Sequence, residues 1–299
     1  MKRALTILIL ISFCLVIFAQ ELQTLRINAE KGDIDSQWKL AGMYAEGRGV
    51  EQNMAEALKW CRKAADQGHA QAQINLGISY YFGKGCEQNY EEALKLFRKA
   101  AEKGKVVAIF YLGLSSEEGN GVVQNYKEEL KWYTLSAEMG YDEAQSKLGK
   151  YYYWGLGTAV DYKLAATWFR KAAEQGMPEA QYNLGQLYKQ GQGTPKDYKE
   201  AVKWFTLAAQ QGYDHAQFIL AGCFAEGLGV EQNWSEANKW CKKAAAQGMP
   251  EALYNLGISY IAGRGIQKDT SEGIIYLRMS ANKGFKDAQD MLIKLGIDN

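Results

Sequence analysis

The chain has 299 residues, of which 47% are hydrophobic and 23% charged, and its 35 basic side chains nearly balance its 34 acidic ones. These proportions are those of a globular protein with a sizeable core, and they exclude a low-complexity or disordered chain. The near-neutral balance lacks the broad positive field that nucleic-acid binding requires, so we expect no nucleic-acid partner.

Residues 1–19 predict a cleaved signal peptide. Lys2 and Arg3 form a basic start, and an uncharged, apolar run follows from Ala4 to Ala19. This run is short for a membrane span but matches the core of an export signal. We therefore expect a periplasmic or secreted protein. The alternative is an uncleaved segment that anchors the protein to the inner membrane, which would be its only membrane contact.

The rest of the chain repeats every 36 residues. A glycine pair, first seen as Gly47 and Gly49 in the stretch GRGVEQN, recurs six more times at this step, and a second glycine series keeps the same step. A nucleotide-binding loop needs a preceding strand, a third glycine and a single location, so GRGVEQN is predicted to be a turn. The predicted repeats are 33–68, 69–104, 105–140, 141–176, 177–212, 213–248 and 249–284.

The segments on either side of the repeats are shorter than one repeat. We expect residues 20–32 to form an N-terminal half-repeat cap and residues 285–299 to form a C-terminal capping helix. End units of this kind shield the apolar faces that the terminal repeats would otherwise expose.

Each repeat is predicted to contain two helices. In the second repeat, Ala72, Leu76 and Tyr80 lie at i, i+4 and i+8 and form one buried stripe on the first helix. Gly77 adjoins this stripe, and Gly or Ala stands there in every repeat, which lets the two helices approach closely. The second helix begins after an Asn or Asp that can cap it, followed in six repeats by Glu three residues later. These caps are Asn53, Asn89, Asn125, Asp161, Asp197, Asn233 and Asp269.

Repeat 3 departs from the pattern at two positions. Ser116 stands where the other repeats have an aromatic residue, and Glu129 replaces a small residue. We expect Glu129 to fill the space left by the missing ring. A buried carboxylate needs a hydrogen-bond partner, and Ser116 is the predicted one.

The repeated unit resembles the Sel-one-like repeat family, a relative of the tetratricopeptide repeats. The matching stretches include AQINLGISYYFGKGCEQNYEEALKLFRKAAEKG (72–104) and AQYNLGQLYKQGQGTPKDYKEAVKWFTLAAQQG (180–212). The resemblance covers nearly all of residues 21–299 and implies a right-handed α-solenoid of seven helix-turn-helix repeats, with the first helices on its concave surface. It also implies a protein-binding adaptor, since exported members have been associated with envelope assembly, secretion and host interaction.

One exported branch of that family is cysteine-rich, carries a disulfide in each repeat, and has been associated with penicillin binding and weak β-lactam hydrolysis. The four cysteines after the signal do not follow such a pattern, and we carry none of these activities over. We expect them to be small packing residues, with one disulfide, between the last two, as the alternative. They are Cys61, Cys86, Cys223 and Cys241.

No catalytic, metal or cofactor site is predicted. Ser36 and Ser280 each begin an S-x-x-K pattern, but the companion motifs of serine β-lactamases are absent from the sequence. The chain has no CxxC motif and only two histidines, so metal ligation is not expected. His69 is placed at a helix start and His215 in a first turn, as cap or surface residues.

A partner-binding surface is predicted on the first helices of repeats 2–4. The row opposite the buried stripe is polar in most repeats, yet it carries large aromatic residues in two of them. Such residues are candidate anchors for an apolar peptide segment, whereas the alternative is that they pack on adjacent helices as a widened core. The predicted partner-binding residues are Asn75, Ile78, Phe82, Tyr111, Leu114, Lys147, Lys150 and Trp154.

Two groups within this set have more specific expected roles. Lys147 and Lys150 would flank the aromatic anchors and attract acidic residues. In related repeats an Asn at the position of Asn75 can hydrogen-bond the backbone of a bound peptide, although helix–helix packing explains this residue equally well.

The sequence therefore predicts a monomeric, exported, non-enzymatic scaffold that binds a protein or peptide. Two alternatives stay open: an enzyme that hydrolyses β-lactams weakly, and a carbohydrate-binding envelope component, because exposed aromatic residues also stack on sugars. The identity of the partner does not follow from the repeat, since a few surface residues can change specificity while the fold is unchanged.

Overall fold

The computed structural model describes residues 19–297, and all regular secondary structure in this range is helical. Residues 19–30 form a helix, seven helix pairs follow, and a last helix, α16 (Lys286–Lys294), ends the described chain. The predicted all-α solenoid of tandem helix pairs is thus confirmed. None of the helices in residues 19–297 is long and apolar enough to cross a membrane. All but the last residue of the predicted signal lies outside the described residues.

We call the first helix of each repeat its A helix and the second its B helix. The A helices are α2 (Ile34–Glu46), α4 (Ala70–Phe82), α6 (Val106–Glu118), α8 (Asp142–Trp154), α10 (Pro178–Gln190), α12 (Asp214–Glu226) and α14 (Pro250–Ala262). The B helices are α3 (Met54–Asp66), α5 (Tyr90–Glu102), α7 (Tyr126–Glu138), α9 (Tyr162–Glu174), α11 (Tyr198–Gln210), α13 (Trp234–Ala246) and α15 (Thr270–Asn282).

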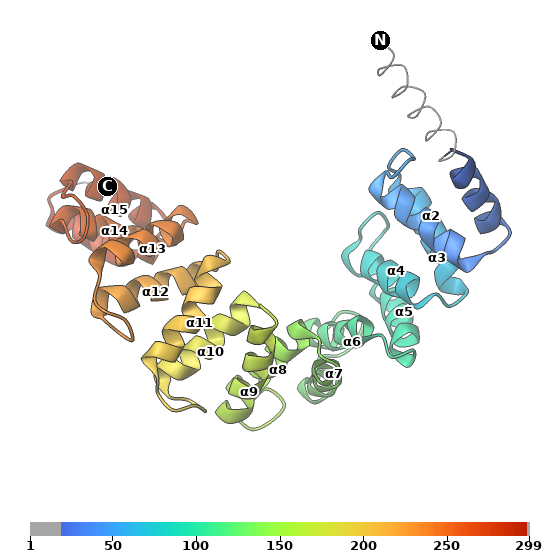
Figure 1. Cartoon of the computed structure of the whole chain (residues 1–299), viewed down its shortest axis with the longest axis horizontal. Coiled ribbons are helices and arrows are strands. Elements are labelled where there is room, and N and C mark those ends of the chain that lie inside the picture. Colours follow the sequence, from blue (N-terminus) through green and yellow to red (C-terminus); the bar gives the residue numbers. More distant parts are fainter. Residues whose placement is uncertain (1–18, 298–299) are drawn as a thin grey trace, which may run out of the picture. The chain divides into compact units, whose positions relative to one another are not determined.

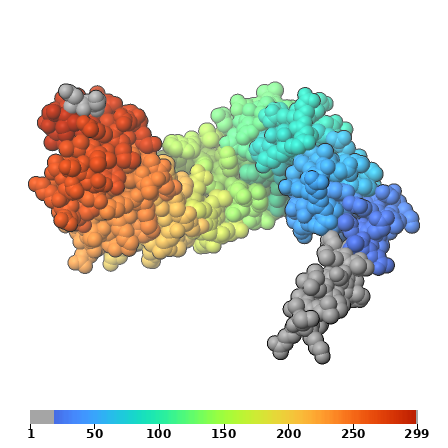
Figure 2. All heavy atoms as spheres, turned by 90° about the horizontal axis from the view of Figure 1, so that it is seen from above, coloured from blue at the N-terminus to red at the C-terminus, as the bar shows by residue number. Residues whose placement is uncertain are grey.

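The helices form two compact units, divided in sequence between Met139 and Gly140. Unit 1 contains α2 to α7 and unit 2 contains α8 to α16. Within each unit an A helix packs on the B helix of its own repeat, and that B helix packs on the next A helix (Figure 1). The space-filling view shows the orange and red repeats of unit 2 lying against one another in chain order (Figure 2). Each unit is therefore held together by contacts between neighbours in the sequence.

The predicted caps of the B helices are confirmed in all seven repeats. In repeat 1, for example, Asn53 Oδ1 accepts from the backbone N–H of Glu56 at 3.1 Å. The backbone N–H of Asn53 donates to the carbonyl of Tyr44 at 2.9 Å. Glu56 instead forms an ion pair on the helix surface, with Lys59 Nζ 2.8 Å from its Oε1. A lysine three residues after the glutamate lies on the same face of the helix, which favours this pairing.

Both glycine series adopt positive φ angles, so the predicted turns are confirmed. Gly47 and Gly49 both have φ +70°, and Gly68 in the second series has φ +91°. The N–H of His69 donates to the carbonyl of Ala64, and that of Gly68 donates to Ala65, which closes the C-terminus of α3. The stretch GRGVEQN is a turn between two helices of one repeat.

The small residue on each A helix is matched in size to one B-helix side chain. A Cβ placed on Gly185 would lie 2.6 Å from Phe205 Cε1, so only glycine fits against this ring. Gly77 and Phe97 show the same relation at the same distance. Where the B helix carries a cysteine in place of the ring, the A helix carries alanine in place of glycine. These alanine–cysteine pairs are Ala41 with Cys61 and Ala221 with Cys241.

Three of the four cysteines, Cys61, Cys223 and Cys241, are buried packing residues, as the sequence predicts, whereas Cys86 is half-buried. All four are free thiols, and the disulfide considered between Cys223 and Cys241 is not formed. Cys61 Sγ donates to the carbonyl of Ala72 at 3.4 Å, and Cys241 Sγ donates to that of Ala252 at 3.2 Å. Burial raises the pKa of Cys61 to about 11 and that of Cys241 to about 12, so neither is a thiolate at neutral pH.

Buried glutamines tie successive helices together. Gln217, which is 4% exposed, donates from Nε2 to the carbonyl of Ala209 at 3.1 Å. Its Oε1 accepts from Gln247 Nε2 at 3.0 Å. In repeat 3 both partners of this pair are replaced together, by Ile109 and Met139. The joint change avoids leaving one amide buried without its partner.

We expect Gln217→Ile to lower the free energy of unfolding by about 1–3 kcal/mol, because Gln247 and the Ala209 carbonyl each lose a partner. The double variant Gln217→Ile/Gln247→Met, which reproduces the pair of repeat 3, should recover most of this loss. Urea denaturation of the wild type and the two variants measures both effects. Equal stability of the single and double variants would contradict the coupling between the two amides.

Repeat 3 places Glu129 in the core, where its side chain is fully buried. The backbone N–H of Asn125 donates to Glu129 Oε1 at 3.1 Å, so the carboxylate caps its own helix. Part of the space at Ser116 stays open as a cavity of about 180 Å³, whose lining includes Ser116 and Trp132. The hydrogen bond expected between Ser116 and Glu129 stays a prediction.

Candidate functional site

In unit 1 the predicted binding residues lie on two A helices, α4 and α6. Asn75 and Phe82 on α4 are exposed, the latter by 48%. Ile78, Tyr111 and Leu114 are half-buried and pack against the core of repeats 2 and 3. The two interpretations weighed from the sequence therefore apply to different residues: three belong to a widened core, and two face solvent.

The exposed ring of Phe82 is held in place by neighbouring aromatic side chains. Its ring packs edge-on against Tyr81, with centroids 5.0 Å apart, and against Tyr111 at 6.4 Å. Tyr111 in turn stacks on the buried ring of Phe97 at 5.0 Å. Lys84 Nζ lies 5.1 Å from the Phe82 centroid, close enough for a cation–π contact. The exposed ring is thus held from behind by the core.

In unit 2 the predicted residues lie on α8. Trp154 is 67% exposed and packs edge-on against Tyr153, with centroids 4.7 Å apart. Lys150 Nζ forms an ion pair with Glu179 Oε1 at 2.6 Å, and Lys147 is half-buried on the same helix. The positive charge of Lys150 is therefore already paired within the chain.

Trp154 lies at the edge of a cavity of about 250 Å³ between α8 and α10. Lys150 and Tyr182 also line this cavity. Three polar side chains of α10 complete it, at the repeat positions of Asn75, Ile78 and Phe82. These are Asn183, Gln186 and Gln190. The positions predicted to bind a partner in the second repeat thus border a cavity between the fourth and fifth repeats.

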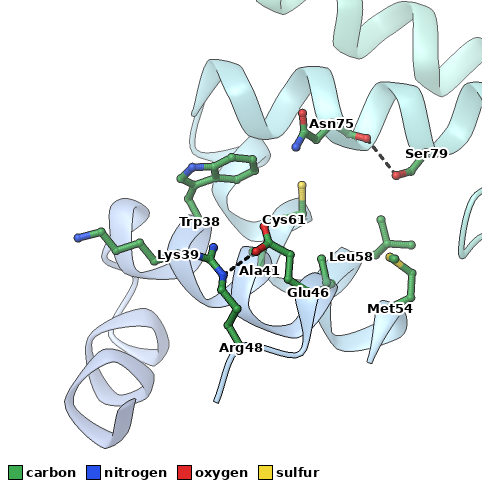
Figure 3. A pocket seen from close by; sticks show the side chains of 13 residues that line it. Trp38, Lys39, Ala41, Glu46, Arg48, Met54, Leu58, Cys61, Asn75 and Ser79 are labelled. Carbon is green, nitrogen blue, oxygen red and sulfur yellow. Dashed lines mark hydrogen bonds and ion pairs between the residues drawn. The ribbon is translucent and has the colours of Figure 1, made fainter. Parts of the chain in front are cut away.

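Sequence reasoning missed a larger cavity, of about 330 Å³, in repeat 1 (Figure 3). This cavity lies between α2 and α4. The sequence prediction searched for large aromatic residues, whereas this cavity is bordered by small ones. Three lining residues hold the repeat positions of Asn75, Ile78 and Phe82: they are Lys39, Gly42 and Glu46. A joint loss of side-chain size on both helices is the available signal, but repeat 6 shares it, so the sequence alone did not point to repeat 1.

The candidate catalytic groups are used structurally. Ser280 is fully buried, and its Oγ donates to the carbonyl of Pro250 at 2.7 Å. His69 Nδ1 accepts from the backbone N–H of Ala72 at 3.1 Å and so caps α4, as expected. Within residues 19–297, no group of three or more His, Cys, Asp or Glu side chains is arranged to hold a metal ion. The surface described above offers shape and aromatic contacts, which are the features of a binding site.

The chain belongs to the Sel1 repeat family. Seven consecutive segments match the Sel1 repeat without a gap between them. The matched segments are 34–69, 70–105, 106–141, 142–177, 178–213, 214–249 and 250–285. Members of this family are generally protein–protein interaction modules. No curated protein matches the chain.

Two solved structures are similar in both sequence and fold. One is c5321, described as a protective antigen present in uropathogenic Escherichia coli strains with an SLR fold, which is 34% identical with a TM-score of 0.87. The match covers 92% of this chain but only 59% of c5321, so this chain spans less than two thirds of that relative. The other is a Sel1 repeat protein from Oxalobacter formigenes, 34% identical with a TM-score of 0.69 over 80% of this chain and 96% of that one.

Proposed function

We propose that this protein is a non-enzymatic scaffold that binds a segment of a partner protein through its A helices. The proposal rests on the exposure of Phe82 and Trp154, which share one repeat position. Elsewhere this position holds a charged, polar or small residue. Exposed aromatic side chains held rigidly from behind are typical anchors of protein interfaces, because they bury a large area at little cost in conformational entropy.

We also propose that the protein acts outside the cytoplasm, in envelope assembly, secretion or host interaction. Two observations support this setting: the basic and apolar pattern of residues 1–19, and the similarity to an antigen of uropathogenic Escherichia coli. The similar structures give no support to β-lactam hydrolysis or to carbohydrate binding.

We expect the variant Phe82→Ala/Trp154→Ala to lose at least about tenfold in affinity for the partner, because anchors of this type contribute most of the energy of an interface. The partner is first captured from the envelope fraction with the wild-type protein and identified. Its affinity for the purified wild type and variant is then measured by titration calorimetry.

The matched control is Leu135→Ala/Leu207→Ala. Both leucines are 43% exposed and lie on B helices, so the control removes two exposed apolar side chains from a different set of helices. Its affinity should equal that of the wild type. Equal binding by the Phe82/Trp154 variant, or a loss confined to the control, would place the interface away from the predicted residues.

A further inference from the structure

The cavity of repeat 1 lies beside three positions that are large in the next repeat and small here. In repeat 2 these positions hold Ile78, Tyr81 and Phe97, and the last two rings are buried with centroids 6.3 Å apart. In repeat 1 they hold Gly42, Ala45 and Cys61. Repeat 6 has the same small residues, but it carries Ile219, Leu228 and Trp234 where repeat 1 has Lys39, Arg48 and Met54. The cavity volume of about 330 Å³ is ample for one aromatic ring, since an apolar cavity of about 150 Å³ already takes up benzene.

The walls of this cavity suit a ring. Trp38 forms one side and is held by stacking on His69, with centroids 5.0 Å apart. Leu58 and Met54 form the other side, and Cys61 lies between the two (Figure 3). The Cys61 thiol is committed to a backbone carbonyl and stays protonated, so it presents a polarisable, uncharged sulfur of the kind that contacts aromatic rings favourably.

The mouth of the cavity carries more positive than negative charge. Arg48 folds over Gly42, where its Nη2 would lie 3.7 Å from an added Cβ, and it pairs with Glu46 at 2.6 Å. Both members of this pair are more than half exposed, so the pair is weak and can rearrange. Lys39 also lines the mouth and has no ion-pair partner within the described residues. The lining residues thus include two cations and one carboxylate, and the Lys39 amine extends away from the Arg48–Glu46 pair (Figure 3).

One polar group at the mouth is available to a polypeptide backbone. Asn75 Oδ1 accepts from Gln71 Nε2 at 3.0 Å. In the part of the chain that the structure describes, the amide nitrogen of Asn75 has no hydrogen-bond acceptor, and the residue lines the cavity from α4 (Figure 3). This nitrogen can donate to a peptide carbonyl beside the inserted side chain.

We propose that this cavity binds one aromatic side chain of a partner protein, in an extended segment where an acidic residue adjoins the aromatic one. The ring replaces those that repeat 2 supplies from its own helices, and the neighbouring carboxylate meets Arg48 and Lys39. The proposal rests on the proposed scaffold function and adds to it a specific anchor in repeat 1, separate from Phe82 and Trp154.

The test uses three blocked tripeptides, acetyl-Asp-Trp-Asp-amide, acetyl-Asp-Ala-Asp-amide and acetyl-Lys-Trp-Lys-amide, with free indole as a fourth probe. Binding to the full chain is followed by NMR shifts of alanine and leucine methyl groups. We expect Asp-Trp-Asp to bind about 10- to 100-fold more tightly than Asp-Ala-Asp, as burial of an aromatic side chain implies. It should also bind more tightly than Lys-Trp-Lys and indole.

Filling the cavity should abolish this preference. Gly42→Ile introduces the side chain of repeat 2 at a helical position with ordinary φ, where the one close neighbour is the end of the flexible Arg48 side chain. Gly222→Ile is the matched control: Gly222 is the equivalent position of repeat 6, nothing lies within 4 Å of an added Cβ there, and Leu228 replaces Arg48. The control should bind Asp-Trp-Asp like the wild type.

The second filling variant is Ala41→Gly/Cys61→Phe, which copies the Gly77–Phe97 pair and should raise Tm while it blocks binding. Two results would overturn the proposal: wild-type affinity of both filled variants for Asp-Trp-Asp, or equal binding of the Trp and Ala peptides. Indole binding as tightly as Asp-Trp-Asp would overturn the assignment to a protein segment. These failures leave the scaffold function intact, because that function is tested separately at Phe82 and Trp154.

Discussion

Phe205→Ala will lower the free energy of unfolding by about 3–5 kcal/mol, the loss typical of a large ring removed from a close-packed core. The ring is fully buried and faces Gly185, so the space left behind cannot be closed by a neighbouring side chain on α10. Denaturant unfolding followed by far-UV circular dichroism measures the change. Leu207→Ala, on the same helix but 43% exposed, is the control and should change stability by no more than about 0.5 kcal/mol.

A second control, at positions 185 and 205, tests why Phe205→Ala lowers the stability. Gly185→Ala/Phe205→Cys would reproduce the Ala221–Cys241 pair of repeat 6. If the loss comes from the missing fit between the two helices, this double variant should be more stable than Phe205→Ala. A loss from Phe205→Ala no larger than that from the exposed Leu207→Ala would show that the ring is not a core residue.

Among the turn glycines, Gly193 is the position where one added methyl group will be most disruptive. We expect Gly193→Ala to lower the free energy of unfolding by about 3–5 kcal/mol. Gly193 has φ +68°, where a Cβ is strained, and this Cβ would overlap the backbone carbonyl of Tyr162 at the start of α9. Backbone atoms of a capped helix end cannot move aside as a flexible side chain can. Thermal and denaturant unfolding of the purified variant measure the effect.

Gly176→Ala separates the two causes. Gly176 has φ +96° but nothing within 4 Å of an added Cβ, so only the conformational strain of about 1–2 kcal/mol applies. Equal losses from the two substitutions would mean that the close approach between the turn and α9 contributes nothing. A larger loss at Gly193 would measure that approach directly.

Local signals in the sequence were sufficient for most of the fold. The cap of each B helix depends on one side chain and the backbone three residues later, so Asn53 and its equivalents could be recognised from spacing alone. Glycines such as Gly68 mark left-handed turns because other residues are strained there. The 36-residue period then fixes how the helix pairs succeed one another.

The candidate site was harder to predict because it depends on residues from different helices. The ion pair between Lys150 and Glu179 joins positions 29 residues apart, which no local pattern indicates. Tyr111 and Leu114 lie on the predicted face, but both pack against the core, and Phe97 of the adjacent B helix stacks on Tyr111. The repeat 1 cavity is lined by residues of three helices, among them Ala45 of α2, Cys61 of α3 and Asn75 of α4.

The hydrogen bonds between successive repeats have a consequence for synthesis on the ribosome. Gln247 bonds to the carbonyl of Gly212, 35 residues earlier, and Asn120 bonds to Tyr81, 39 residues earlier. A translating ribosome supplies this length of chain in roughly 2–8 s, whereas helices form in about a microsecond. Each repeat can therefore find its preceding neighbour already folded when it emerges, so the growing chain need expose little more than one unfinished repeat at a time.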